Sequence, residues 1–424
     1  MSDRFHVTYL LTLTADEDPE ERIRALQLEQ SAELPDHVVH SLGMQHVAGS
    51  VTSVTSLDAS VERLRGALRQ LEVTIAWPGN NHGSEITQLL NVLFGNISMK
   101  TGIAVTDIRW EDLSGGNATI LSGSAFGIAR IREKWDIHGR ALACTALKPM
   151  GFSSRKLADL AYRFALGGVD IIKDDHGLAD QHTAPFTERV KMCVEAVDRA
   201  AQKTGRRSRY FPNVTTDPHR VAERYEQAAG LGADGVLLCP MLVGPALMHH
   251  LARLNTGLPI MAHPAFSGPY VAQGIAPGST DTRQEFPATD STAKRDVTGS
   301  TVRAGSPSTR KKAHVTVPHG FEPGLFYGGL MRALGADFTI YPNTGGRFSF
   351  SRETCDAIND HARRDGQPFA RCFPTPGGGM QRDRMAHWLD TYGIDTTFLM
   401  GGSLFEDPAG IEAASRAFME ALGA

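Results

Sequence analysis

The stretch Gly167-Gly-Val-Asp-Ile-Ile-Lys-Asp-Asp-His176 decides the fold, because it is a short apolar run that ends in charged residues. Helical patterns flank it at residues 154–166 and 187–203. A near-continuous apolar strand between two amphipathic helices is typical of a parallel sheet whose outer face is covered by helices. The stretch therefore predicts a parallel strand over residues 169–175 in an α/β fold.

This strand–turn–helix unit occurs eight times after about residue 141, which predicts a (β/α)8 TIM barrel over residues 141–424. The expected strands are 141–148, 169–175, 209–214, 235–239, 259–263, 337–342, 369–374 and 396–400. The expected helices are 154–166, 187–203, 218–230, 246–254, 322–334, 352–364, 382–391 and 408–422. An open doubly wound sheet is the alternative, but such sheets usually have about five or six strands.

Residues 1–140 lack this rhythm and predict a smaller N-terminal α+β domain of the ferredoxin-like type. The expected strands are 5–14, 47–57, 71–77, 108–110 and 125–135. The expected helices are 20–32 and 84–99, and Ser84 is the expected N-cap of the second helix.

One segment interrupts the barrel pattern between the fifth strand and the fifth helix. Residues 278–310 carry twelve Ser or Thr residues and one aromatic residue. Such a segment buries too little apolar surface to offset the entropy of ordering. We expect a flexible insertion, and a lid over the barrel mouth is the alternative.

Composition and charge exclude several classes of protein. The 424 residues are 41% hydrophobic and 21% charged, with a net charge of −4. These values are ordinary for a globular protein and exclude a disordered chain, a collagen and a coiled coil. They also argue against nucleic acid or an anionic membrane as a partner. The one basic cluster, Arg310-Lys311-Lys312, is expected to be a solvated loop end.

The cysteines and the N-terminus indicate the compartment. The five cysteines are widely spaced and form no CxxC motif, which argues against a disulfide framework or a zinc site. The first residues do not resemble a secretory signal, and no stretch reaches 18 apolar residues. We expect a cytoplasmic protein with buried, reduced thiols and no membrane partner.

The charged end of the second barrel strand predicts a functional site, because catalytic residues of such barrels project from the carboxyl ends of the strands. Lys173 and Asp175 share one face of the strand, and His176 begins the following loop. In one interpretation, a carbamate formed from CO₂ on Lys173 joins Asp175 and His176 around a divalent cation. In the other, which spacing alone favours, Lys173 and Asp175 form a buried ion pair.

Other strand ends add candidates. Lys148 precedes Pro149 and suits acid–base catalysis if it is desolvated near a cation, or it simply faces solvent. His263 closes the fifth strand and can transfer protons or serve the structure. Glycines 377–379 and 401–402 follow the seventh and eighth strands, where barrels frequently bind phosphate. Because the chain lacks a GxxxxGK[ST] motif, we predict a small phosphorylated ligand rather than a hydrolysed nucleotide.

These residues resemble the large subunit of ribulose-bisphosphate carboxylase (RuBisCO), and more closely the RuBisCO-like proteins of form IV. The resemblance covers nearly the whole chain in order, apart from the insertion. The matching segments are the strand at 167–175, Thr145-Ala-Leu-Lys148-Pro149, His263, the glycines at 377–379 and 401–402, and Gly95-Asn96.

The resemblance implies an antiparallel homodimer, in which the N-terminal domain of one subunit covers the barrel of the other and supplies Asn96. It implies that Lys173 is carbamylated and binds Mg²⁺ with Asp175 and position 176. It also implies that Lys148 is the acid–base of an enolisation. The implied ligands of a substrate phosphate are Gly378, Gly379, Gly401 and Gly402.

Several positions depart from the carboxylase. His176 stands in place of an acidic ligand, which leaves Mg²⁺ or another divalent metal open, because Mg²⁺ prefers oxygen ligands. Met150 replaces a lysine, Pro264 replaces an arginine of one phosphate site, and Gly377 replaces a serine. The loop after the sixth strand has no lysine but carries Arg347, which can bind an anionic group. These changes argue against carboxylation of ribulose bisphosphate.

We therefore expect a lyase, hydrolase or isomerase that acts on a singly phosphorylated keto-sugar or oxo-sugar acid through a metal-stabilised enediolate. Because Arg347 could bind a carboxylate, the first hypothesis is a decarboxylase or C–C hydrolase of a branched oxo-sugar acid phosphate, such as 3-oxo-isoapionate 4-phosphate. The alternative is an isomerase or enolase of a methylthio-pentulose phosphate in methionine salvage. A third hypothesis is a non-catalytic, sugar-phosphate-binding member whose metal site is broken by His176.

Overall fold

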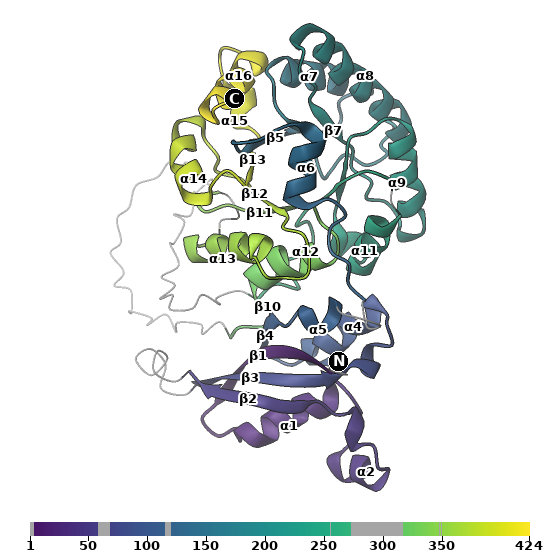
Figure 1. The fold of residues 1–424 in the computed structure, drawn as a ribbon, viewed down its shortest axis with the longest axis vertical. Coiled ribbons are helices and arrows are strands. Elements are labelled where there is room, and N and C mark those ends of the chain that lie inside the picture. Colours follow the sequence, from purple (N-terminus) through teal and green to yellow (C-terminus); the bar gives the residue numbers. More distant parts are fainter. Residues whose placement is uncertain are drawn as a thin grey trace, which may run out of the picture.

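The computed structural model describes residues 4–57, 68–114, 120–254, 256–272, 317–346, 348 and 350–424. It contains an eight-stranded parallel sheet with covering helices and a five-stranded, mostly antiparallel sheet. Figure 1 shows the smaller sheet below the larger one, with β10 beside β4. The predicted insertion at 278–310 and the basic cluster at 310–312 lie outside the described residues.

The larger sheet confirms the predicted barrel. Its strands follow the order β7-β6-β5-β13-β12-β11-β9-β8, and a parallel bridge between Asn213 and Leu237 joins the two ends. The strands are β5 (Leu142–Leu147), β6 (Ile171–Asp174), β7 (Arg209–Phe211), β8 (Val236–Leu238), β9 (Ile260–Ala262), β11 (Phe338–Pro342), β12 (Phe373–Gly377) and β13 (Thr397–Leu399). The strand expected at 369–374 begins only at Phe373, because Phe369 packs against Trp110 instead of joining the sheet.

Helices cover the outer face of the barrel, as the sequence predicts. They are α7 (Ser154–Leu166), α8 (Phe186–Thr204), α9 (Val221–Gly230), α11 (Pro245–Arg253), α13 (Arg352–Arg363), α14 (Met385–Tyr392) and α16 (Ile411–Ala421). Shorter helical turns are η5 (Pro218–Arg220), α10 (Pro240–Val243), η7 (Arg382–Arg384) and α15 (Ser403–Glu406).

The expected helix at 322–334 is instead a π-helix, η6 (Gly324–Leu330), followed by α12 (Met331–Ala333). The reason is close packing of its glycines against α13. A Cβ on Gly328 would lie 2.5 Å from the carbonyl oxygen of Ile358, so no larger residue fits there.

The strand expected at 125–135 is wrong, because this segment forms helix α6 (Gly127–Trp135). Ile128, Ile131 and Trp135 lie on one face of α6 and pack against the inner residues of the barrel strands. The carboxylate of Asp337 accepts hydrogen bonds from the backbone N–H groups of Phe126 and Gly127, at 3.0 and 2.8 Å. Helix α6 therefore closes the amino end of the barrel, across which it lies in Figure 1.

The smaller sheet has the order β10-β4-β1-β3-β2. Its strands are β1 (Arg4–Thr14), β2 (Ser50–Ser56), β3 (Leu68–Pro78), β4 (Ile103–Ile108) and β10 (Gly320–Phe321). Its helices are α1 (Pro19–Glu29), α2 (Asp36–Ser41), η1 (Gln45–Val47), η2 (Gly79–His82), α4 (Ile86–Phe94), η3 (Asn96–Met99) and α5 (Glu111–Ser114). Residues 320–321 add a parallel strand to β4, so the sheet includes a segment from the later part of the chain.

Two expectations for the N-terminal region are corrected. The strand expected at 108–110 is β4, which ends at Ile108 rather than beginning there. The helix expected at 84–99 begins at Ile86 and ends at Phe94, since Gly95 caps it and a separate turn follows. Ser84 is not the N-cap, because its φ of 64° places it in a left-handed turn before the helix.

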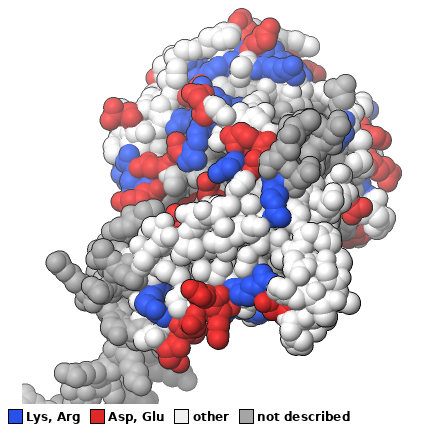
Figure 2. All heavy atoms as spheres, turned by 60° about the horizontal axis from the view of Figure 1, so that its bottom comes forward, with Lys and Arg blue, Asp and Glu red and all other residues white. Residues whose placement is uncertain are grey.

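The cysteines and the surface charges match what the sequence predicts for a globular protein. All five cysteines are buried and free. Figure 2 shows one face of the molecule, on which basic and acidic side chains alternate around a broad uncharged area. Within the described ranges, no helix has the length and apolar character that crossing a membrane requires.

Candidate active site

Residues predicted from separate strands meet at the carboxyl end of the barrel. Lys148 follows β5, Lys173 lies in β6, Asp175 and His176 follow β6, and His263 follows β9. Lys148 Nζ lies 3.4 Å from Asp175 Oδ1, and His176 Nδ1 lies 3.6 Å from Asp175 Oδ2. The rings of His176 and His263 stack with their centroids 4.4 Å apart. The structure thus brings these five predicted residues into one cluster.

Lys173 is the buried member of this cluster, with 2% of its surface exposed. Its Nζ donates a hydrogen bond to the carbonyl oxygen of Asp174 at 3.0 Å. Burial lowers the pKa of Lys173, because the charged ammonium loses its hydration, and the charge of Asp175 offsets this only in part. A lower pKa increases the fraction of neutral amine, which is the form that adds CO₂.

Asp175 is an ionised carboxylate held among cations. Partial burial alone would raise its pKa, but the nearby His176 ring and the charges of Lys173 and Lys148 outweigh this effect and lower the pKa. Its nearest basic side chains are Lys148, with which it forms an ion pair, and His176. The simple Lys173–Asp175 ion pair, which spacing alone favoured, is therefore replaced by a pair with Lys148.

His263 has a defined tautomer. Its Nδ1 accepts a hydrogen bond from the backbone N–H of Ala265 at 3.1 Å, so the proton of the neutral ring sits on Nε2. Burial lowers the pKa of His263 well below its usual value, and the charges of Lys173 and His176 lower it further. The ring is therefore a neutral hydrogen-bond donor at the carboxyl end of the barrel.

The predicted phosphate-binding glycines lie in two loops of different character. Gly378 and Gly379 have φ values of 89° and 67°, which disfavour residues with a Cβ. A Cβ on Gly379 would also lie 3.0 Å from the backbone of Gly345, so the loops after β11 and β12 meet backbone to backbone. Gly401 and Gly402 face open space. Their role in binding phosphate stays a prediction.

Two predicted site residues lie elsewhere. Asn96 is in η3 beside the smaller sheet, where its Nδ2 donates a hydrogen bond to Glu29 Oε1 at 3.3 Å. Arg347 lies outside the described residues, although Gly346 and Phe348 on either side of it are described.

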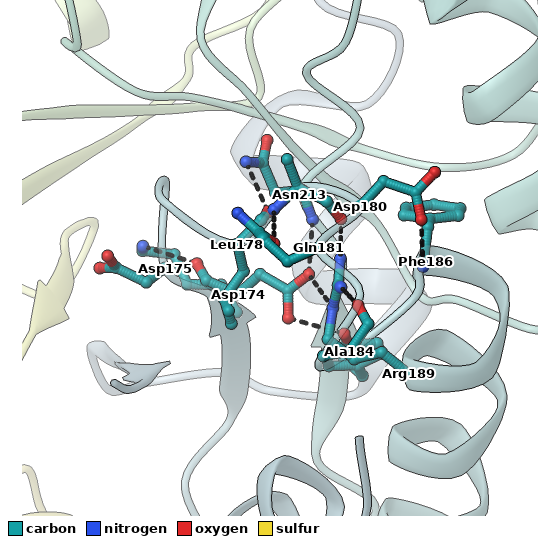
Figure 3. Close-up of polar contacts among 12 residues, drawn as sticks. Asp174, Asp175, Leu178, Asp180, Gln181, Ala184, Phe186, Arg189 and Asn213 are labelled. Atoms are coloured by element: carbon teal, nitrogen blue, oxygen red, sulfur yellow. Dashed lines mark hydrogen bonds and ion pairs between the residues drawn. The ribbon is translucent and has the colours of Figure 1, made fainter. Parts of the chain in front are cut away.

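Sequence reasoning missed a buried polar network behind the cluster, shown in Figure 3. Asp174 pairs with Arg189 of α8, and it also accepts hydrogen bonds from the Tyr210 hydroxyl and the backbone N–H of Asn213. All four residues have no exposed surface. Asn213 could have been found from its place at the end of a strand, but no local pattern links Arg189 to this site.

The fit of a divalent cation depends on the state of Lys173. The described residues contain no group of three His, Cys, Asp or Glu side chains placed to hold a metal ion. Asp175 and His176 supply two donors, and a carbamate on Lys173 would supply the oxygen of a third. The donor set therefore fits a divalent cation only when Lys173 is carbamylated.

Comparisons with known proteins show the family to which the chain belongs. The family model for the ribulose bisphosphate carboxylase large chain, catalytic domain, matches residues 127–275. The 5-methylthioribulose-1-phosphate isomerase of Rhodospirillum rubrum is 33% identical over 408 residues, which cover 96% of this chain and 92% of that protein. The ribulose bisphosphate carboxylase-like protein 1 of Rhodopseudomonas palustris is 34% identical, with coverages of 95% and 93%.

A solved structure extends the likeness to three dimensions. The crystal structure of a Rubisco-like protein from Rhodopseudomonas palustris matches with a TM-score of 0.77 at 30% identity, and the match covers 100% of this chain and 98% of that one. Two chains that are this similar over nearly their full lengths belong to the same family. The chain therefore belongs to the RuBisCO large-chain family, in its RuBisCO-like branch.

Proposed function

We propose that this protein is an isomerase or enolase that moves a proton beside the carbonyl group of a methylthio-pentulose phosphate. The observation that carries the proposal is the cluster of Lys148, Asp175, His176 and His263 next to the buried Lys173. The full-length similarity to a 5-methylthioribulose-1-phosphate isomerase supports the same substrate class.

The chain's own residues have distinct parts in this reaction. The half-exposed side chain of Lys148 can reach a bound substrate, and it removes or returns the proton at the carbon beside the carbonyl. The Nε2–H of His263 donates a hydrogen bond to a substrate oxygen. Mg²⁺ or another divalent cation, held by carbamylated Lys173, Asp175 and His176, would polarise the substrate carbonyl.

Exposed apolar side chains after several barrel strands favour a substrate with one phosphate and one apolar end. Met150, Leu242, Phe266 and Phe348 follow different strands of the barrel and are 62%, 52%, 60% and 76% exposed. Pro264 stands where the carboxylase has an arginine for a second phosphate. A methylthio group would bury apolar surface against these side chains, whereas a second phosphate would lack the arginine that Pro264 replaces.

The first hypothesis, a decarboxylase or hydrolase of an oxo-sugar acid phosphate such as 3-oxo-isoapionate 4-phosphate, depends on Arg347. That residue lies outside the described part of the chain, so this hypothesis has sequence support only. The alternative is supported by the exposed apolar side chains after the barrel strands and by the similarity to an isomerase.

We also propose that the working unit is a homodimer in which Asn96 completes the site of the partner subunit. In support, Asn96 lies beside the smaller sheet rather than in the cluster, and its neighbour Met99 is 79% exposed.

The test is proton exchange in deuterated water. The protein, with Mg²⁺ and bicarbonate, is incubated with 5-methylthioribulose 1-phosphate, and NMR follows deuterium entering beside the carbonyl. We expect exchange and turnover, and much less with ribulose 1-phosphate, which lacks the methylthio group. Binding without exchange would indicate the non-catalytic alternative, and CO₂ release from an oxo-sugar acid phosphate would restore the first hypothesis.

A further inference from the structure

The loop after β6 carries both proposed ligands, Asp175 and His176, yet side chains from other elements hold it in place. Figure 3 shows these side chains converging on the loop from α8 and from the end of β7. The loop also has hydrogen bonds of its own: Leu178 N–H donates to the Asp175 carbonyl at 3.0 Å, Ala179 N–H donates to Gln181 Oε1 at 2.9 Å, and Gln181 Nε2 donates to the Gly177 carbonyl at 2.7 Å.

Arg189 fixes the far end of this loop. Its Nη1 donates to the carbonyl of Ala184 at 2.6 Å, and its Nη2 donates to the carbonyl of Ala179 at 2.7 Å. Its Nε donates to Asp174 Oδ2 at 3.1 Å. One buried guanidinium thus joins the last residue of β6 to the loop that follows it.

Asn213 fixes the near end, next to the proposed ligands. Its Nδ2 donates to the carbonyl of His176 at 3.0 Å and to the carbonyl of Leu178 at 2.9 Å. Its Oδ1 accepts from Thr215 N–H at 3.1 Å, and its own N–H donates to Asp174 at 3.0 Å. The amide therefore uses both donors and an acceptor, which fixes its orientation.

We propose that Asn213 is a positioning residue, which acts through the backbone of residues 176–178 to hold His176 and Asp175 ready for a divalent cation. The inference rests on the proposed function, because it takes these two residues as ligands. A side chain that orients a ligand from behind typically changes metal affinity by about 10- to 100-fold when it is replaced.

The test uses Asn213→Asp, which keeps the size of the side chain and the acceptor for Thr215. The new carboxylate oxygen would face the carbonyls of His176 and Leu178 and repel them. We measure the affinity for Mn²⁺ in bicarbonate buffer by electron paramagnetic resonance, and the hydrogen exchange of residues 175–181 by mass spectrometry. We expect about 10- to 100-fold weaker binding, an altered Mn²⁺ spectrum and faster exchange.

The matched control is Asn359→Asp in α13. Asn359 is also buried, and its Nδ2 donates to the Tyr341 hydroxyl at 3.0 Å and the Cys355 carbonyl at 2.8 Å. This variant loses a comparable buried amide but should keep the Mn²⁺ affinity of the wild type. If Asn213→Asp does not fold, Asn213→Ala, which also loses both donors, takes its place.

The outcomes separate this inference from the proposed function. Unchanged affinity in the Asn213 variant, or an equal loss in the Asn359 control, would overturn the positioning role. If the wild type itself binds no Mn²⁺ with bicarbonate, the proposed metal site fails. Hydrogen exchange then decides alone: unchanged exchange at 175–181 overturns the role of Asn213, and faster exchange supports it.

Discussion

The two ends of the barrel use the same strands for opposite purposes. At the amino end, Trp135 of α6 stacks on Phe338 at 5.9 Å, and Phe338 stacks on Phe373 at 5.2 Å. At the carboxyl end, the same sheet places Lys173 and Asp175 beside three other titratable side chains. The amino end is closed by a helix whose aromatic side chain packs on the inner strand residues, whereas the carboxyl end holds a cluster of titratable side chains.

The contrast indicates that the residues that stabilise the fold and the residues proposed for the reaction lie at opposite ends of the strands. Aromatic burial at the amino end contributes free energy of folding without taking part in a reaction. Burial of Lys173 at the other end is unfavourable for its charge and lowers the pKa of its amine. Substitutions at the two ends should therefore affect different measurements.

The largest effect is expected from Lys173→Met. Turnover should fall by about 10³-fold or more, because the proposed carbamate and its cation are both lost. The thermal midpoint should stay equal or rise, since a buried amine is replaced by an apolar side chain of similar length. The control is Lys191→Met on the exposed side of α8, which should change neither value. Retained turnover in the Lys173 variant would contradict the metal–enediolate mechanism.

The opposite end gives the second prediction. Trp135→Ala should lower the free energy of unfolding of the barrel by about 3–5 kcal/mol, because it leaves a cavity under Phe338. Turnover per folded molecule should be unchanged within about twofold. Denaturant unfolding measures the first value, and Leu42→Ala, at a residue that is 60% exposed, is the control. A loss below about 1 kcal/mol would show that α6 is not the closure of the barrel.

The sequence predicted the fold far better than it predicted α6. Barrel strands are recognisable because each one is a continuous apolar run between helices, as at 169–175. In residues 125–135, Phe126 and Ile128 alternate as in a strand, whereas Ile128, Ile131 and Trp135 have helical spacing. The segment forms a helix because Ile128, Ile131 and Trp135 can then all pack against the inner residues of the barrel strands. This contact is between distant parts of the chain, so the local sequence alone does not decide between helix and strand.

The site divides in the same way. The grouping of Lys148, Asp175, His176 and His263 was predictable because residues at the carboxyl ends of the strands share one edge of the barrel, while their roles stay a prediction. The pair of Asp174 and Arg189 was not, because it joins a strand to a helix 15 residues later through a buried contact. Charged residues at a strand end can be recognised in a sequence. Residues such as Arg189, which contact the strand end from a neighbouring helix, cannot.

The third prediction tests whether the candidate site at the carboxyl end of the barrel needs Asn96 from a second subunit. Asn96→Ala should lower turnover by about 10- to 100-fold. If Asn96 acts in the partner subunit, refolding this variant together with Lys173→Met should restore about a quarter of wild-type activity, since each mixed dimer has one intact site. Each variant refolded alone is the control. Activity no higher than the sum of the two variants would place Asn96 outside the partner's site.

The smallest effect concerns a buried histidine on α11. His249 is 5% exposed, and a hydrogen bond of 3.2 Å links its Nε2 to the Ser122 hydroxyl, in the segment that leads to α6. Burial lowers the pKa of His249 to about 4, and the charges of Arg253 and His250 contribute. The unfolded chain therefore binds a proton below about pH 6.5, where the folded chain does not until about pH 4.

Stability contributed by the neutral His249 should accordingly be lost as the pH falls from about 6.5 to 4. Between pH 7 and 5, the wild type should lose on the order of 2 kcal/mol more than His249→Gln, which keeps a hydrogen-bonding group for Ser122 but cannot titrate. Unfolding at a series of pH values measures this difference, and His138→Gln, at an exposed histidine, is the control. Parallel pH profiles for the wild type and His249→Gln would contradict the prediction. Turnover measured at pH 7 should stay the same in His249→Gln, because the histidine lies on α11 beside the segment before α6 and not at the carboxyl end of the barrel.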